Sequence, residues 1–143
     1  MMTVADPNAR ILVVDDFGVV RREVTLLLKK IGFSNIDTAE DGLEAFVKLR
    51  SKDYALVLSD LTMSEMGGLD LLRSVRADHG LQDLPFIMVT GHNDPINIIA
   101  AKKAGVSGYI VKPFNADTLR QRIETVMGPM PAPPSSPRPL GFT

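Results

Sequence analysis

Three carboxylates in the chain directly follow runs of apolar residues. Asp15 and Asp16 follow "ILVV", and Asp60 follows "ALVLS". If these carboxylates lie within a few ångströms, each pair repels by roughly 4 kcal/mol at an effective dielectric constant of 20. A hard divalent cation relieves such repulsion, and Mg²⁺ typically takes one or two carboxylates, several waters and a phosphate oxygen. These residues therefore predict an Mg²⁺ site.

Two further residues offer groups that could bind an anion beside the metal. Thr90 follows "FIMV" and Lys112 follows "GYIV". The lysine could carry an ammonium into the same pocket, and the threonine offers a hydroxyl group. One Asp after an apolar run is usually a loop residue or a helix cap. Five suitable groups at such positions favour a common site.

The elements that position these residues follow from the hydrophobic pattern. Between Arg10 and Met127, short β-branched runs alternate with longer segments of helical period, which predicts parallel strands joined by crossover helices. Strands are expected at residues 11–15, 35–39, 55–60, 86–90 and 108–112. In open sheets of this kind, ligands lie outside the carboxyl ends of the strands. The five candidate groups lie at those ends.

The first two helices have distinct patterns. One buried stripe is expected on the first helix, which Gly32 ends, from the spacing of Val20, Val24, Leu27, Leu28 and Ile31. Asp41 followed by Glu44 resembles a capping box that opens the second helix. The residues expected to face the core from this second helix are Leu43, Phe46 and Val47.

The remaining helices are predicted from shorter signals. A third helix is expected at about residues 69–76. Asp94 would cap the fourth helix, with Pro95 in its first turn, and Asn115 would cap the fifth, with Phe114 against Leu119.

Length and composition predict a single domain. The chain has 143 residues, 45% of them hydrophobic, which suits one domain with a core. Six of the ten prolines lie in the last sixteen residues, which cannot form a helix or central strand. We therefore expect an N-terminal extension at residues 1–9, a domain at 10–128 and a proline-rich flexible tail at 129–143.

Charge and cysteine content exclude several kinds of partner. Sixteen basic and seventeen acidic residues leave a net charge of -1, without the positive excess that nucleic acid or a membrane surface would attract. No stretch approaches the ~20 apolar residues of a membrane span. The absence of cysteine excludes thiolate metal sites and fits a reducing compartment. The sequence predicts a cytoplasmic protein without nucleic-acid or membrane partners.

Several motifs together resemble a known family. They read "ILVVDDFGVVRR", "LVLSDLTM", "LPFIMVTG" and "SGYIVKPF", with 44 residues from Asp16 to Asp60 and 22 from Thr90 to Lys112. From about residue 10 to 128, the chain resembles the receiver domains of response regulators, in particular CheY-type single-domain receivers of chemotaxis. The resemblance implies an α/β, flavodoxin-like, doubly wound (βα)5 fold with a five-stranded parallel sheet of order 2-1-3-4-5.

The resemblance also implies roles for the candidate residues. Asp60 would accept a phosphoryl group from a histidine kinase, while Asp15, Asp16, Asp60 and the main-chain carbonyl of Thr62 hold Mg²⁺. Lys112 and Thr90 would bind the phosphoryl oxygens. Such a protein is a self-phosphorylating acceptor that dephosphorylates itself, not an enzyme that turns over an external substrate.

A conformational switch and its output are implied in the same way. Thr90 and Tyr109 would move as a pair and reshape the face formed by the fourth helix, the fifth strand and the fifth helix. This face would bind a flagellar motor switch, a phosphotransfer protein or a kinase. Thr62 and His92 would tune the lifetime of the phosphoryl group. The Lys112–Pro113 bond would be cis.

The loop after Asp60 departs from the family pattern. Ser64 stands where the family usually has proline, and Gly67 replaces an acid before Gly68. A looser loop and weaker metal binding are expected.

Two other functions would require different residues at the same positions. A flavin carrier would need a phosphate-binding loop after the first strand, where Asp15 and Asp16 repel a phosphate. An aspartyl-phosphate phosphatase commonly has Asp-x-Asp, which this chain lacks. A DNA-binding regulator would need an effector domain after Gly128. A phosphorylation-independent docking module stays open, because the same residues permit activity without demonstrating it.

Overall fold

The protein alternates five strands and five helices along the residues that the computed structural model describes, which are 6–63, 66–91 and 95–129. The strands are β1 (Arg10–Val14), β2 (Asn35–Ala39), β3 (Leu56–Asp60), β4 (Phe86–Thr90) and β5 (Gly108–Val111). The helices are α1 (Gly18–Ile31), α2 (Gly42–Ser51), α3 (Gly68–Ala77), α4 (Pro95–Lys103) and α5 (Ala116–Met127). No helix in these ranges is long and apolar enough to cross a membrane.

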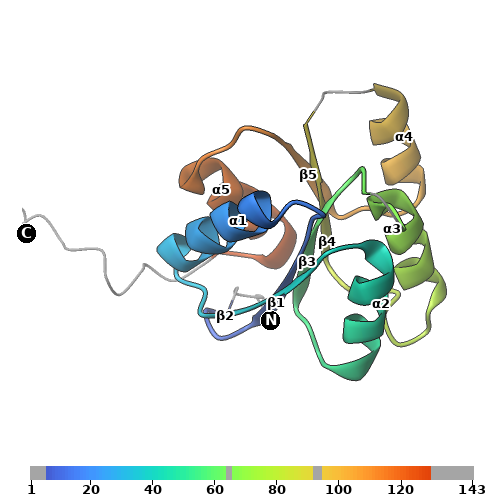
Figure 1. The fold of residues 1–143 in the computed structure, drawn as a ribbon, viewed down its shortest axis with the longest axis horizontal. Helices are drawn as coiled ribbons and strands as arrows, with labels where there is room; N and C mark the ends of the chain where they lie inside the picture. The colour runs from blue at the N-terminus through green and yellow to red at the C-terminus, as the bar shows by residue number, and fades with distance from the viewer. Residues whose placement is uncertain (1–5, 64–65, 92–94, 130–143) are drawn as a thin grey trace, which may run out of the picture.

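All strand pairs in the sheet are parallel, and the strand order is β2-β1-β3-β4-β5. This confirms the predicted doubly wound topology. Helices α1 and α5 cover one face, and α2, α3 and α4 cover the other (Figure 1). The strand order reverses between β1 and β3, where Val14 pairs with Ser59. The next residues in this register, Asp15 and Asp60, therefore lie opposite each other at the carboxyl edge.

Alternate residues of the central strands enter two separate cores. In β3, Leu56 and Leu58 pack in the core under α1 and α5, whereas Val57 packs in the core under α2 and α3. Every residue of β3 and β4 is buried. Because full burial of a Val or Leu side chain contributes about 1.5–3 kcal/mol, these strands form a rigid support for the residues at their ends.

Four predicted strand ends, on three strands, differ from the structure by one residue. The structure begins β1 at Arg10 and ends it at Val14, begins β3 at Leu56, and ends β5 at Val111. The predicted end residues still carry ladder hydrogen bonds: the Asp15 N–H donates to the Ala39 carbonyl at 3.1 Å, and the Lys112 N–H to Thr90 at 2.7 Å. Asp15 and Lys112 therefore have an anchored backbone although they lie just outside the strands.

The predicted stripe on α1 is confirmed. Val24, Leu28 and Ile31 are buried, and Val20 and Leu27 pack partly buried against the same core. The helix begins earlier than the stripe, at Gly18, and its N-cap residue Phe17 makes no side-chain capping bond. Gly32 ends the helix with a positive φ of 129°, which glycine adopts without strain.

The capping of α2 was predicted correctly, but its buried face was not. Asp41 accepts a hydrogen bond from the Glu44 N–H at 2.8 Å, while the Glu44 carboxylate accepts from Glu40 rather than from Asp41. Leu43 and Val47 are about three-fifths exposed, at 61% and 62%, which contradicts their predicted inward orientation. Only Phe46 of that predicted face is partly buried.

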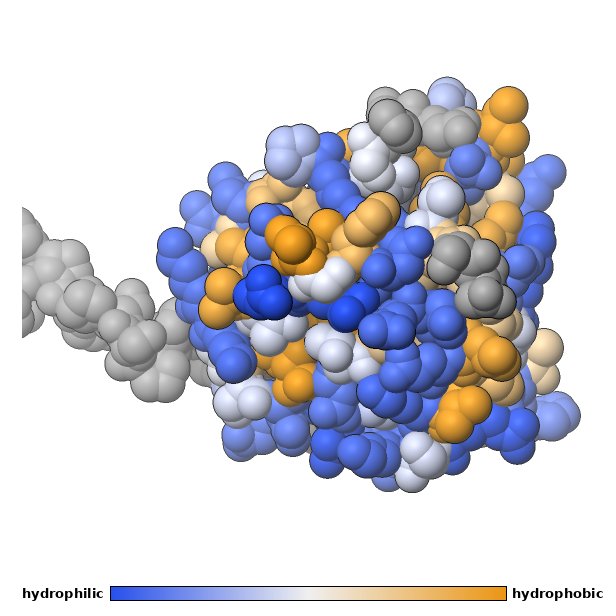
Figure 2. Space-filling model, viewed as in Figure 1, coloured by the Kyte–Doolittle hydropathy of each residue, from blue (hydrophilic) through white to orange (hydrophobic). Residues whose placement is uncertain are grey.

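The reason is close packing by small residues of α2. Gly42, Ala45 and Leu49 form the buried side. A Cβ on Gly42 would lie 2.5 Å from the Met66 carbonyl oxygen, so only glycine allows this approach. The larger residues consequently point outward, and hydrophobic side chains are visible on the surface over α1 and α2 (Figure 2).

The other predicted caps have mixed outcomes. Asn115 accepts a hydrogen bond from the Thr118 N–H at 2.9 Å, so the cap of α5 is confirmed. Pro95 is the first residue of α4, as predicted, whereas Asp94 lies outside the described residues.

Candidate functional site

The carboxyl edge of the sheet brings the predicted acids together. Asp15 and Asp16 follow β1, and Asp60 ends the adjacent strand β3. One carboxylate oxygen from each of these residues lies within 4.8 Å of the other two. Asp15 and Asp60 are 3% and 8% exposed, so their charges are largely removed from water. The three acids therefore form one electronegative cluster.

Lys112, which follows the edge strand β5, reaches this cluster across the end of β4. Its Nζ lies 3.3 Å from Asp15 Oδ2 and 3.4 Å from Asp60 Oδ1. Burial raises the pKa of the Asp60 carboxyl above its ordinary value; the Lys112 ammonium opposes this shift, and the Asp15 carboxylate adds to it. This single ammonium does not neutralise the three carboxylates of the cluster.

One oxygen of the cluster has no hydrogen-bond partner within residues 6–63, 66–91 and 95–129. Asp16 Oδ1 is buried and accepts no hydrogen bond, in the part of the chain that the structure describes. A buried acceptor of this kind is costly unless something satisfies it. A hard divalent cation would satisfy it, since carboxylate oxygens are the ligands that Mg²⁺ prefers. The donor set therefore fits Mg²⁺.

A hollow of about 550 Å³ lies over these residues. Its lining includes Asp16, Asp60, Thr62, Thr90, Asn97 and Lys112. Thr90 ends β4, which is adjacent to β3; it is buried and lines this hollow. The hollow places carboxylates, a hydroxyl and an ammonium around one space. It can hold a metal ion and a small anion together.

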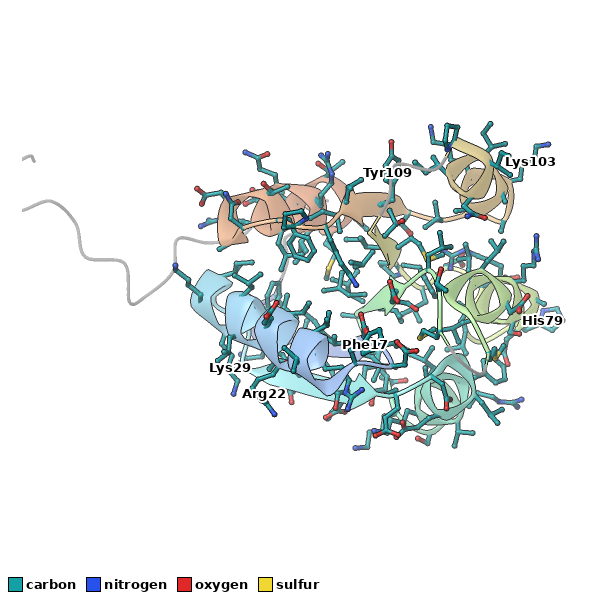
Figure 3. All side chains as sticks on the ribbon, turned by 45° about the horizontal axis from the view of Figure 1, so that its top comes forward. Phe17, Arg22, Lys29, His79, Lys103 and Tyr109 are labelled. Atoms are coloured by element: carbon teal, nitrogen blue, oxygen red, sulfur yellow. The ribbon has the colours of Figure 1, made fainter. Side chains whose placement is uncertain are left out.

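The backbone around the acids is fixed by short-range contacts. Asp15 Oδ1 accepts a hydrogen bond from the Phe17 N–H at 3.0 Å, and the Asp15 carbonyl accepts one from Arg21 Nη1 at 2.6 Å. Phe17 lies where α1 begins, beside the hollow (Figure 3). On the β3 side, a Cβ on Gly68 would lie 2.2 Å from the Asp60 carbonyl oxygen. Gly68 thus lets α3 begin directly against the backbone of Asp60.

The remaining predicted residues lie around this site in different ways. Tyr109 lies on the edge strand β5 (Figure 3) and is half-buried. The Lys102 ammonium lies 5.9 Å from the centre of its ring. Thr62 is exposed and lines the hollow. The Lys112–Pro113 peptide bond is cis, the form that the family resemblance implied. His92 and Ser64 lie outside the described residues.

Two residues of the site were not predicted from the sequence. Asn97 lines the hollow from α4. It is the polar residue in the run "PINIIAA", and this placement could have marked it. Arg21 follows Asp15 by six residues, and nothing in the pattern distinguishes it from Arg22 beside it.

Known proteins are similar to this chain over most of its length. The sequence profile of the response regulator receiver domain matches residues 11–124. Chemotaxis protein CheY-3 of Vibrio cholerae is 44% identical over 126 residues, covering 88% of this chain and 97% of that protein. Chemotaxis protein CheY of Pseudomonas aeruginosa is 45% identical over 117 residues, covering 82% and 94%.

A solved structure of another chemotaxis protein has a similar fold. Chemotaxis protein CheY4 of Vibrio cholerae superposes with a TM-score of 0.79 at 32% identity, covering 84% of this chain and 99% of that one.

Proposed function

The chain belongs to the response regulator receiver domain family, and on this premise we propose that it is a phosphorylation-operated switch with Asp60 as the phosphoryl acceptor. The observation that carries the proposal is the contact of Lys112 Nζ with both Asp15 and Asp60, at 3.3 and 3.4 Å. The contact supports the proposal because it brings the Asp60 carboxylate, the Lys112 ammonium and the Asp15 carboxylate together beside one hollow.

The proposed reaction is an in-line phosphoryl transfer from a phosphohistidine of a kinase. One carboxylate oxygen of Asp60 attacks phosphorus, the P–N bond breaks, and its electron pair returns to the imidazole. Lys112 is close enough to Asp60 to pair with the oxygens of the arriving phosphoryl group. The Thr90 hydroxyl lies at the same hollow and donates to those oxygens. Positioning and charge compensation account for most of the rate enhancement, since phosphoryl transfer has a loose transition state.

Mg²⁺ is the proposed cofactor. Asp15, Asp16 and Asp60 would hold it, together with the main-chain carbonyl of Thr62 that the family resemblance implies. When bound, the ion neutralises charge that develops on the transferring phosphoryl oxygens. Two observations support this assignment: the Asp16 oxygen has no hydrogen-bond partner among the residues that the structure describes, and the donor atoms are all oxygens.

The proposed output is a change in the face formed by α4, β5 and α5. The phosphoryl group on Asp60 carries a charge of about -2 beside Thr90, and movement of Thr90 with Tyr109 would transmit the change to β5. This face already has exposed apolar residues on α4, namely Ile96 and Ile99, at 78% and 52% exposure. Exposed apolar residues of this kind suit a protein partner.

Chemotaxis is the proposed context, because the relatives are named chemotaxis proteins. The proposed phosphodonor is a histidine kinase, and the proposed target is a flagellar motor switch; a phosphotransfer protein or a kinase are the other candidate targets. His92 and Thr62 are proposed to tune the phosphoryl lifetime. A cytoplasmic location and the domain boundaries at residues 10 and 128 stay predictions.

Intact mass after incubation with Mg²⁺ and acetyl phosphate tests the proposal. The native chain should gain about 80 Da, the mass of one phosphoryl group, and lose it again on standing, without turning over an external substrate. Asp60→Asn should gain nothing, and the exposed Asp53→Asn should behave as the native chain. Absence of the adduct from the native chain would favour the phosphorylation-independent docking module.

A further inference from the structure

The guanidinium of Arg21 lies against the backbone of the acid pair. Its Nη1 donates to the Asp15 main-chain carbonyl at 2.6 Å, and its Nη2 lies 3.7 Å from Glu40 Oε1. The Arg21 side chain is 19% exposed, whereas Glu40 is 73% exposed. The hydrogen bond to Asp15 is therefore the better sheltered of the two contacts, and the ion pair to Glu40 is weak.

The location of Arg21 is unusual for a helix. Its N–H donates to the Phe17 carbonyl, so it lies in the first turn of α1. A cation is disfavoured near a helix N-terminus, where acids are preferred. This turn has no acidic residue, and Phe17 makes no side-chain cap. The stability of α1 therefore does not account for an arginine there, but the contact with Asp15 does.

Holding the Asp15 carbonyl also orients its neighbour. This carbonyl belongs to the Asp15–Asp16 peptide, which is planar, so fixing its oxygen restricts the directions in which both side chains leave the backbone. Asp15 Oδ1 is further held by the Phe17 N–H. Asp16 Oδ1 has no such bond among the described residues, so its position depends more on how the backbone of this peptide is held.

We propose that Arg21 is a positioning residue for the cation site: its hydrogen bond to the Asp15 carbonyl holds the Asp15–Asp16 peptide so that both carboxylates are arranged for a divalent cation. This inference rests on the proposed function, because it takes Asp15, Asp16 and Asp60 as the ligands. Arg21 touches neither the metal nor the phosphoryl group in this role. Groups that orient metal ligands typically contribute a factor of about 10–100 in metal affinity.

The chain offers a matched control at the next position. Arg22 is exposed on the outer side of α1, near Lys29 (Figure 3). Among the residues that the structure describes, it makes no ion pair within 4 Å of the kind formed by Arg21. Replacing Arg22 removes the same charge from the same turn without changing the contact with Asp15.

The test is cation affinity, measured on the full chain by the loss of the free Mn²⁺ electron paramagnetic resonance signal and by competition with Mg²⁺. Mn²⁺ takes the same oxygen ligands as Mg²⁺. Arg21→Ala and Arg21→Lys should each weaken affinity about tenfold, because lysine keeps the charge but not the planar donor. Arg22→Ala should stay within about twofold of the native chain. Circular dichroism confirms that each variant is folded.

Each other outcome overturns the inference in a recognisable way. If charge alone mattered, Arg21→Lys would bind as the native chain does, and Arg21→Ala would bind more tightly because a repelling cation is gone. Unchanged affinity in both Arg21 variants would exclude any role at the metal site. If the native chain bound no cation at the Asp60 cluster, with Asp16→Asn as reference, the proposed function would fail together with the inference.

Discussion

Lys112 Nζ lies 3.4 Å from Asp60 Oδ1, although the two residues are 52 positions apart in the chain. The lysine follows β5 and the aspartate ends β3, and β4 lies between these strands. The lysine therefore extends across the end of β4, where Thr90 lies, to reach Asp60. The contact compensates part of the negative charge before any ligand arrives.

Lys112→Ala should slow phosphoryl acceptance by about 100-fold, because it removes a donor aimed at developing negative charge. The rate is measured by intact mass over time with acetyl phosphate and Mg²⁺. Lys103→Ala, an exposed position on α4, is the control and should keep the native rate. An unchanged rate in Lys112→Ala would remove the lysine from the proposed mechanism.

Asp60→Asn should stabilise the metal-free protein at neutral pH. Burial raises the pKa of Asp60, so the folded state holds this proton more tightly than the unfolded state. The resulting stability is present below about pH 4, the ordinary pKa, and is lost as the pH rises through the raised value. Asparagine avoids that loss, so the melting temperature at pH 7 should rise by on the order of 3 °C.

The gain in Asp60→Asn should shrink as the pH falls toward 4, where Asp60 itself becomes neutral. Thermal unfolding by circular dichroism in chelator, at both pH values, measures this difference. An equal gain at pH 7 and pH 4 would mean that charge is not the cause.

Gly68→Ala should destabilise the protein by about 1–3 kcal/mol, because the new Cβ would lie 2.2 Å from the Asp60 carbonyl oxygen and 2.9 Å from Met88 Sδ. Gly67→Ala is the matched control, since its nearest neighbour, the Leu61 carbonyl oxygen, lies 3.4 Å away. Urea unfolding measures both. Equal effects of the two substitutions would show that the close approach at Gly68 is not what limits this position.

The hydrophobic pattern predicted the sheet well because the central strands are buried on both faces. An apolar run such as the one before Asp60 can form few structures other than a buried strand. Once the strand is predicted, the position of the residue at its end is predicted too. The three acids were predicted as a group for this reason, whereas Lys112 follows the edge strand β5 and was predicted from its place at a strand end. The pattern on α1 was equally clear, since its stripe repeats over three turns.

Other features depend on packing that spacing does not encode. The outward orientation of Leu43 and Val47 follows from the contact of Gly42 with the Met66 carbonyl, which joins the start of α2 to the segment just before α3. The contact of Arg21 with Asp15 is a side-chain bond to the main chain, and any neighbouring arginine could have made it. Such contacts cannot be predicted from sequence spacing, because they depend on differences of tenths of an ångström in the positions of the atoms.

The distance along the chain between Asp15 and Lys112, 97 residues, has a consequence for biogenesis. The acids emerge from the ribosome with the first half of the chain, whereas the lysine follows the last strand. Contacts of such high sequence separation form only once the intervening chain has been ordered. A nascent or truncated chain thus holds the acids without their lysine, and signalling competence arrives together with completion of the sheet.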